Sequence, residues 1–117
     1  MTLKLETRVS NGVVILSCAG RIVFGVEANA LREALKHLLG SNKQIIVNMS
    51  AVSYIDSGGL ASLAGACSSA RRAGAEIKLM GLGPRIKDAL QVTKLVTVFE
   101  IYDSEQQAVA AFQRDVA

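Results

Sequence analysis

Residues 44–60 read QIIVNMSAVSYIDSGGL, in which a short apolar run is followed by the sequence Asp-Ser-Gly-Gly. The run Gln44–Met49 is too short for a helix and is apolar on both faces, which is typical of a central strand covered on both sides. After the glycines, apolar residues recur at helical spacing to about Arg72, and Gly74 ends the helix. The segment therefore predicts a buried strand that leads through a short loop into a helix.

The preceding residues predict an antiparallel hairpin and a first helix. Apolar and charged side chains alternate over Leu3–Val9, which indicates a half-exposed strand. The dipeptide Asn11-Gly12 is a strong hairpin signal, and Val13–Ala19 is apolar enough for a second, more buried strand. We expect a loop over Gly20–Gly25 and a helix over Val26–Leu39, where apolar residues again follow helical spacing.

The following residues predict two more strands and two more helices. Glu76–Met80 and Val96–Tyr102 are expected to be strands, and Pro84 suits the first turn of a short helix between them. Asp103 or Ser104 can cap a last helix. The order β-β-α-β-α-β-α-β-α predicts an α/β fold, a mixed sheet whose amino-terminal hairpin is antiparallel and whose helix-connected strands are parallel, with about four helices.

The composition indicates one globular domain over residues 1–117. Half of the residues are hydrophobic, a fifth are charged and there is one proline, which excludes an extensively disordered chain. Every apolar run is shorter than the roughly 18 residues that a membrane span needs. Charged side chains interrupt Met1–Ser10, which is unlike a secretory signal, so we expect a cytoplasmic protein.

Charge and cysteine content exclude other classes of protein. The net charge of +3 is dispersed, with Arg71-Arg72 as one basic pair, and few aromatic residues are present for base stacking. We therefore expect no direct nucleic-acid partner. Cys18 and Cys67 lie far apart without a nearby histidine, which favours two buried, reduced thiols.

The residues also argue against an enzyme, a cofactor and a metal site. His37 is the single histidine, and nothing in the sequence pairs it with Ser57 as base and nucleophile. The segment Gly81–Pro84 lacks the Lys and Ser or Thr of a phosphate-binding loop and is interpreted as a turn. Clustered ligands for a metal ion are missing from the sequence pattern.

Ser57 is the residue that most favours a specific function. Gly58 and Gly59 are poor helix formers at a position where a helix must begin, so a factor other than propensity selects them. Ser57 suits the N-cap of that helix. Two interpretations stay open: the Asp56-Ser57 pair is a structural cap only, or the Ser57 hydroxyl is a phosphorylation switch at a helix N-terminus, where a phosphate is electrostatically tolerated.

The segment Asp56-Ser57-Gly58-Gly59-Leu60, at the start of the second helix in this element order, resembles the STAS domains of bacterial anti-sigma factor antagonists. The resemblance extends over nearly the whole chain. The further matching segments are Val13–Gly20, Ile45–Met49 with Val52 and Ile55, Arg72–Glu76 and Ser104–Ala108.

The resemblance implies a partner-switching mechanism. In the family, the serine after the aspartate is phosphorylated by an anti-sigma factor that is a serine kinase using Mg-ATP, and phosphorylation breaks the complex. A metal-dependent serine phosphatase restores the binding form. Ser57 would be the phosphoacceptor and Asp56 its neighbour, while Gly58, Gly59 and Leu60 would shape the surface that the partner covers. The alternative is a scaffold or accessory STAS domain that is bound constitutively in a signalling or transporter assembly.

Two positions depart from the family pattern. The family usually has Ser or Thr at the position of Gly58. Kinase-binding members typically have two acidic residues in the loop after the second strand, where this chain has Arg21 and Val23. Either Ile22, Val23 and Phe24 form an apolar contact patch for a partner, or these side chains fold back onto the sheet.

Overall fold

The computed structural model describes residues 3–116, and its first element is the expected hairpin. β1 (Leu3–Ser10) runs antiparallel to β2 (Val13–Ile22). Asn11 and Gly12 form the turn with φ angles of 52° and 78°, because a two-residue type I′ turn needs positive φ at both central positions. The hairpin prediction is confirmed.

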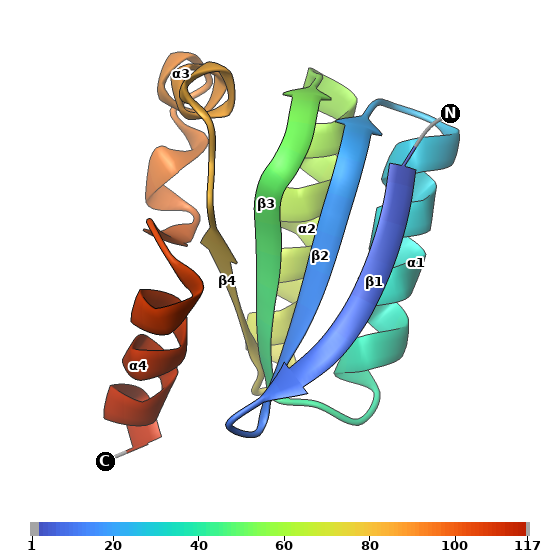
Figure 1. Cartoon of the computed structure of the whole chain (residues 1–117). Coiled ribbons are helices and arrows are strands. Elements are labelled where there is room, and N and C mark those ends of the chain that lie inside the picture. The colour runs from blue at the N-terminus through green and yellow to red at the C-terminus, as the bar shows by residue number, and fades with distance from the viewer. Residues whose placement is uncertain (1–2, 117) are drawn as a thin grey trace.

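The remaining elements alternate between helices and strands, with one short 3-10 helix, η1, before the last strand (Figure 1). The five strands lie in the order β1-β2-β3-β4-β5, and every neighbouring pair after the first is parallel. The mixed α/β fold is therefore as expected. The elements after β2 are α1 (Val26–Leu39), β3 (Gln44–Ile55), α2 (Ser57–Arg72), β4 (Glu76–Met80), α3 (Pro84–Val92), η1 (Leu95–Thr97), β5 (Glu100–Tyr102) and α4 (Glu105–Val116).

Helices cover both faces of the sheet, which explains the continuous apolar run of β3. On one face, α1, α2 and α3 pack over the larger core, to which Ile45 and Val47 contribute. On the other face, α4 packs over a smaller core, to which Ile46 contributes. Successive side chains of a strand point to opposite faces, and all three of these side chains are fully buried. The expected central position of this strand is confirmed.

Three predicted boundaries were wrong. β2 continues to Ile22 and β3 to Ile55, so the loop after β2 is shorter than the expected Gly20–Gly25. The apolar run Val96–Tyr102 is a strand only at its end, because its first part belongs to η1 and Phe99 is buried in the larger core. Apolarity in this run therefore reflects contact with the core and not extended backbone.

The two cysteines lie in the larger core and are not bonded to each other. Cys18 and Cys67 are both free and both 2% exposed. Burial raises the pKa of each thiol to about 12. The expectation of two buried, reduced thiols is confirmed.

Under α4 lies a fully buried lysine that the sequence pattern does not reveal. The Nζ atom of Lys78 is 2.7 Å from Oε1 of Glu100 and 4.5 Å from the ring centroid of Phe112 in α4. A hydrogen bond with the Glu76 carboxyl, together with those from Lys78 and Tyr102, lowers the pKa of Glu100 to about 2. The hydrogen bond between the two carboxyls raises the pKa of Glu76.

Candidate functional site

Asp56 connects the start of α2 to the loop between β2 and α1. Its side chain caps α2, with Oδ1 accepting a 2.8 Å hydrogen bond from the amide of Gly59. Both carboxylate oxygens also accept from the amide of Phe24, each at 3.1 Å. The amide of Asp56 in turn donates to the carbonyl oxygen of Ile22 at 3.2 Å. One residue therefore fixes the helix start against the end of β2.

The expectation that Ser57 caps α2 was wrong. Asp56 is the N-cap, with extended backbone, and Ser57 is the first residue of the helix. Both residue types are good caps, but the Asp56 carboxylate accepts from Gly59 and from Phe24 at the same time. The Ser57 hydroxyl is thus not needed as a cap, and Ser57 is exposed at the helix N-terminus.

The hydrogen bonds to Asp56 also keep it ionised. Its partial burial acts to raise the pKa, but the amides of Gly59, Phe24 and Gly58 donate to the carboxylate and the net pKa lies below the ordinary value. Donors to a carboxylate stabilise the charged form. A full negative charge therefore stands next to Ser57 at neutral pH.

The two glycines after Ser57 permit close packing at the helix start. A Cβ atom at Gly59 would collide with the carbonyl oxygen of Ile22, and one at Gly58 would lie 2.5 Å from Cβ of Phe24. Neither position has space for a larger residue without movement of the neighbouring chain. This explains why poor helix formers occupy the first turn.

The residues expected at a partner surface divide into buried and accessible groups. Ile22 is 0% exposed and Leu60 is 3% exposed, and Gly59 is also buried. Asp56, Gly58 and Val23 are half-buried, whereas Ser57 and Arg21 are exposed and Phe24 is 78% exposed. Ile22 therefore packs into the core, as the second alternative for this loop expects, while Phe24 projects into solvent and stays a predicted contact residue.

Two further apolar residues, at the start of α1 and near the end of β3, are exposed and were not predicted to be so. Val26, at the start of α1, is 80% exposed although it was expected on the apolar face of that helix. Ala28, Leu31 and Leu35 are the buried residues of α1, and their spacing of three and four residues was the available signal. Tyr54 is 42% exposed, and the guanidinium of Arg21 lies 5.4 Å from its ring centroid.

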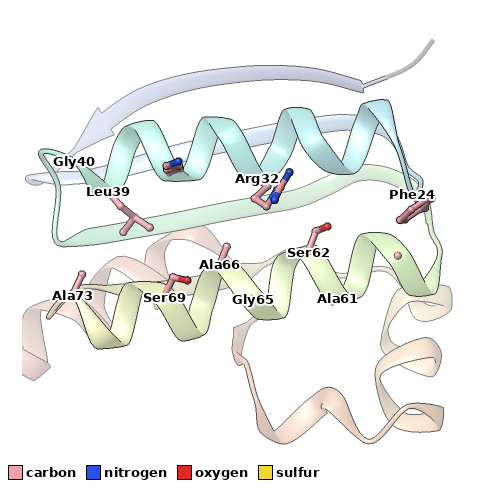
Figure 2. A pocket seen from close by; sticks show the side chains of 12 residues that line it. Phe24, Arg32, Leu39, Gly40, Ala61, Ser62, Gly65, Ala66, Ser69 and Ala73 are labelled. Atoms are coloured by element: carbon pink, nitrogen blue, oxygen red, sulfur yellow. The ribbon is translucent and has the colours of Figure 1, made fainter.

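A groove between α1 and α2 begins beside Ser57 and was also missed. It has a volume of about 760 Å³. Figure 2 shows Phe24 at one end, Arg32 on the α1 side, and Gly40 and Ala73 toward the other end. The α2 side carries small residues, namely Gly58, Ala61, Ser62, Gly65, Ala66, Ser69 and Ala73.

Features of a metal site or a membrane span are not found in the described residues. Among the side chains that the structure describes, those of residues 3–114, His, Cys, Asp and Glu do not gather in groups of three that could hold a metal ion. His37 is exposed on α1. Of the helices in this same part of the chain, none is both long and apolar enough to cross a membrane.

Comparison with known proteins identifies a family over most of the chain. The family model for the STAS domain matches residues 4–108. A putative anti-sigma factor antagonist from Thermotoga maritima has a similar structure, with a TM-score of 0.82, 22% identity and 92% of each chain covered. SpoIIAA of Bacillus, a cell fate determinant solved in its phosphorylated form, has a TM-score of 0.69 and 18% identity, with 95% of this chain and 99% of that chain covered.

A membrane transporter also contains a similar domain. The murine anion transporter Slc26a9 matches with a TM-score of 0.76 and 19% identity, over 97% of this chain but 22% of the transporter. At such low identities these three structures establish a shared fold. The fold occurs both as nearly the whole of a small protein and as one part of a longer one.

Proposed function

The chain belongs to the STAS domain family, and on this premise we propose that it is an anti-sigma factor antagonist switched by phosphorylation of Ser57. The observation that carries the proposal is the position of the Ser57 hydroxyl. Ser57 is exposed, follows the N-cap Asp56 directly and begins α2. A kinase can therefore approach the hydroxyl without unfolding the domain.

The electrostatics of the helix start support a switch in this place. In the proposed reaction, the Ser57 oxygen attacks the γ-phosphorus of ATP, ADP leaves, and the hydroxyl proton passes to a base on the kinase. The new phosphate carries a charge of about −1.5 to −2 and is accommodated by the positive end of the helix dipole. The ionised Asp56 next to it adds a further negative charge. A partner that covers this surface would then meet a much more negative electrostatic potential.

The partners follow from the resemblance to anti-sigma factor antagonists. The unphosphorylated protein would bind an anti-sigma serine kinase and thereby free a sigma factor, and phosphorylation would release the kinase. A metal-dependent serine phosphatase would regenerate the binding form. In this scheme the protein acts in the cytoplasm as a binding component of transcription regulation, while the kinase and the phosphatase supply the catalysis.

A second candidate function is an accessory STAS domain that is bound constitutively in a larger assembly. The similarity to a domain of the Slc26a9 transporter favours this alternative. In that case Ser57 would have no switching role, and a charge at position 57 would leave the assembly intact. Binding measurements with Ser57→Asp therefore distinguish the two functions.

The test is phosphorylation by the anti-sigma serine kinases encoded in the same genome. Each purified kinase is incubated with Mg-ATP and the protein, and the intact mass is measured. We expect one added phosphate on the wild type and on Ser53→Ala, and none on Ser57→Ala. Ser53 is a suitable control because it is also exposed and lies four residues before Ser57.

Two results would contradict the switch. One is a phosphate that is still added to Ser57→Ala. The other is an unmodified wild type with every such kinase, together with a stable complex that Ser57→Asp leaves unchanged. The second result would support the accessory domain.

A further inference from the structure

We propose that the groove between α1 and α2 binds an acidic, helical segment of the kinase partner. This inference rests on the proposed function and adds the chemistry of the surface that the partner presents. The groove is separate from the Ser57 hydroxyl but begins next to it, because Phe24 and Gly58 line its first part.

The floor of the groove suits a helix. Gly58, Ser62, Gly65 and Ser69 follow one another at intervals of three or four residues and therefore share one face of α2. Ala73, the C-cap directly after the helix, continues this row. Small side chains let a second helix approach closely. The space above this face is open, since a Cβ atom added at Gly65 would meet nothing within 4 Å.

The length of the groove suits a segment of several turns. α2 has 16 residues, which corresponds to a helix of about 24 Å. A partner helix of about four turns can therefore lie along it. The groove is bounded on its other side by one face of α1, on which Arg32, Lys36 and Leu39 lie at intervals of four and three residues.

The charges of the groove select an acidic occupant. Arg32 and Lys36 are its charged lining residues, and both are exposed. Arg32 donates a 2.8 Å hydrogen bond to Oδ1 of Asn29, a neutral group. For Lys36, the described chain offers neither an ion pair nor a hydrogen bond to its Nζ atom. Two cations without carboxylate partners thus border an apolar groove, which is complementary to Asp or Glu side chains on an apolar helix.

A second copy of this chain fits the groove less well. A symmetric contact through the groove would bring Arg32 and Lys36 near the same residues of the partner copy, and the chain carries a net charge of +3. Like charges placed together at an interface are destabilising. An acidic segment avoids this repulsion.

The proposed docking also connects to the switch. A phosphate on Ser57 would stand at the end of the groove that Phe24 and Gly58 line. Its negative charge would repel an acidic segment at that end. Release of the partner would then combine the loss of contact at Ser57 with repulsion inside the groove.

The test measures binding of the kinase that phosphorylates Ser57, with ADP in place of ATP so that no phosphate is transferred. The groove variants are Arg32→Glu/Lys36→Glu, which reverses both cations, and Gly65→Leu, which fills the floor. We expect the dissociation constant to rise at least tenfold for each. Circular dichroism melting establishes that each variant is folded.

Matched controls change charge and size elsewhere. Lys4→Glu/Arg114→Glu reverses two exposed cations on β1 and α4, and Gln113→Leu adds a leucine to an exposed position of α4. We expect both controls to bind within about twofold of the wild type, because isolated exposed charges contribute little.

A cross-linking experiment identifies the occupant directly. A photoreactive amino acid at Ser69 should link to a helical kinase segment that contains Asp or Glu. Replacing those acidic residues by Lys should restore binding to Arg32→Glu/Lys36→Glu.

The outcomes separate the inference from the proposed function. If the kinase phosphorylates Ser57 but binds the groove variants as well as the wild type, the groove inference is wrong and the proposed function stands. If no kinase of the genome binds or phosphorylates the protein, both are wrong. A homodimer that Gly65→Leu disrupts, with unchanged kinase binding, would assign the groove to a second copy of this chain.

Discussion

The carboxylate of Asp56 accepts hydrogen bonds from two separate segments of the chain. It accepts hydrogen bonds from the amide of Gly59 in α2 and from the amide of Phe24 in the loop before α1. Ser57, between this anchor and the glycines, has a fixed backbone and an exposed side chain. A rigid backbone beneath an accessible hydroxyl is suited to a group that a second protein must recognise and modify.

Removal of this carboxylate should loosen the site. Asp56→Ala is expected to lower the free energy of unfolding by about 1 to 2 kcal/mol, because an N-cap is lost and the Phe24 amide loses its acceptor. Asp56→Asn should cost less, since Asn is also a good cap. Urea unfolding measures the loss, and hydrogen exchange of the Phe24 and Gly59 amides locates it. Equal exchange in Asp56→Ala and the wild type would contradict this role.

The same residue should give a defined pH dependence. The folded pKa of Asp56 lies below its ordinary value of 3.8, so its stabilisation is complete above that value and is lost as the pH falls through the lower folded pKa. The stability difference between the wild type and Asp56→Asn should therefore be constant near neutral pH and shrink in acid. A difference that grows on acidification would have the wrong sign.

At this scale the sequence predicted the candidate segment but assigned the N-cap to the wrong residue. The segment Asp56–Leu60 was found because Gly58 and Gly59 are unusual at a helix start. Sequence spacing could not decide between two adjacent capping residues, since the decision depends on the Phe24 amide, 32 residues away in the chain. The groove on α2 was not predicted because the small residues Gly, Ala and Ser do not form a hydrophobic or charged pattern in the sequence.

At the scale of elements, two of the three glycines of α2, Gly59 and Gly65, have opposite surroundings. A Cβ atom at Gly59 would collide with backbone of β2, whereas one at Gly65 would meet nothing within 4 Å. Gly59→Ala should therefore destabilise the protein by about 1 to 3 kcal/mol, as overpacking does. Gly65→Ala should stabilise it by up to about 1 kcal/mol through helix propensity.

Chemical denaturation of both variants under the same conditions measures this contrast. Because the substitution is identical and the helix is the same, the difference reports the contact with β2 and not propensity. Similar stabilities for Gly59→Ala and Gly65→Ala would mean that α2 does not depend on this close approach.

Elements with a local signal were predicted well, and those defined by distant contacts were not. The hairpin follows from Asn11-Gly12, whose backbone conformation is a local property. The strand expected over Val96–Tyr102 is mostly η1 and loop, because its apolar side chains pack on the larger core without extended pairing. β3 was predicted too short because several residues after Met49 are exposed and do not alternate clearly.

At the scale of the whole molecule, the sheet separates two cores. α4 covers the smaller core, and α1, α2 and α3 cover the larger one. Lys78 lies in the smaller core, where its Nζ atom contacts Glu100 at 2.7 Å and Glu76 at 3.5 Å. A lysine in a strand normally suggests a solvent-facing position. Its burial depends on the packing of α4, which a sequence pattern does not contain.

Changes to this ion pair should have unequal effects. Lys78→Met replaces the cation by an apolar side chain of similar length, and we expect a change between none and a stabilisation of about 2 kcal/mol. Glu100→Ala leaves Lys78 with a weaker partner and should destabilise the protein by about 1 to 3 kcal/mol. Denaturant unfolding measures both, and a larger loss in Lys78→Met than in Glu100→Ala would overturn this account.

Acid should weaken the contacts of the Glu100 carboxylate in the wild type. The pKa of Glu100 is lowered from 4.5 to about 2, so its contribution is complete above 4.5 and is lost as the pH falls toward 2. Glu100→Ala removes the titrating carboxyl and should therefore have a flatter stability profile across this interval in urea unfolding.

The burial of Cys18 and Cys67 makes the native protein inert to thiol reagents at neutral pH, because both side chains are covered and protonated. A single cysteine engineered into the exposed surface would therefore accept a maleimide dye selectively, without removal of either natural thiol. The rate at which Cys18 and Cys67 react would instead measure how often the domain opens transiently.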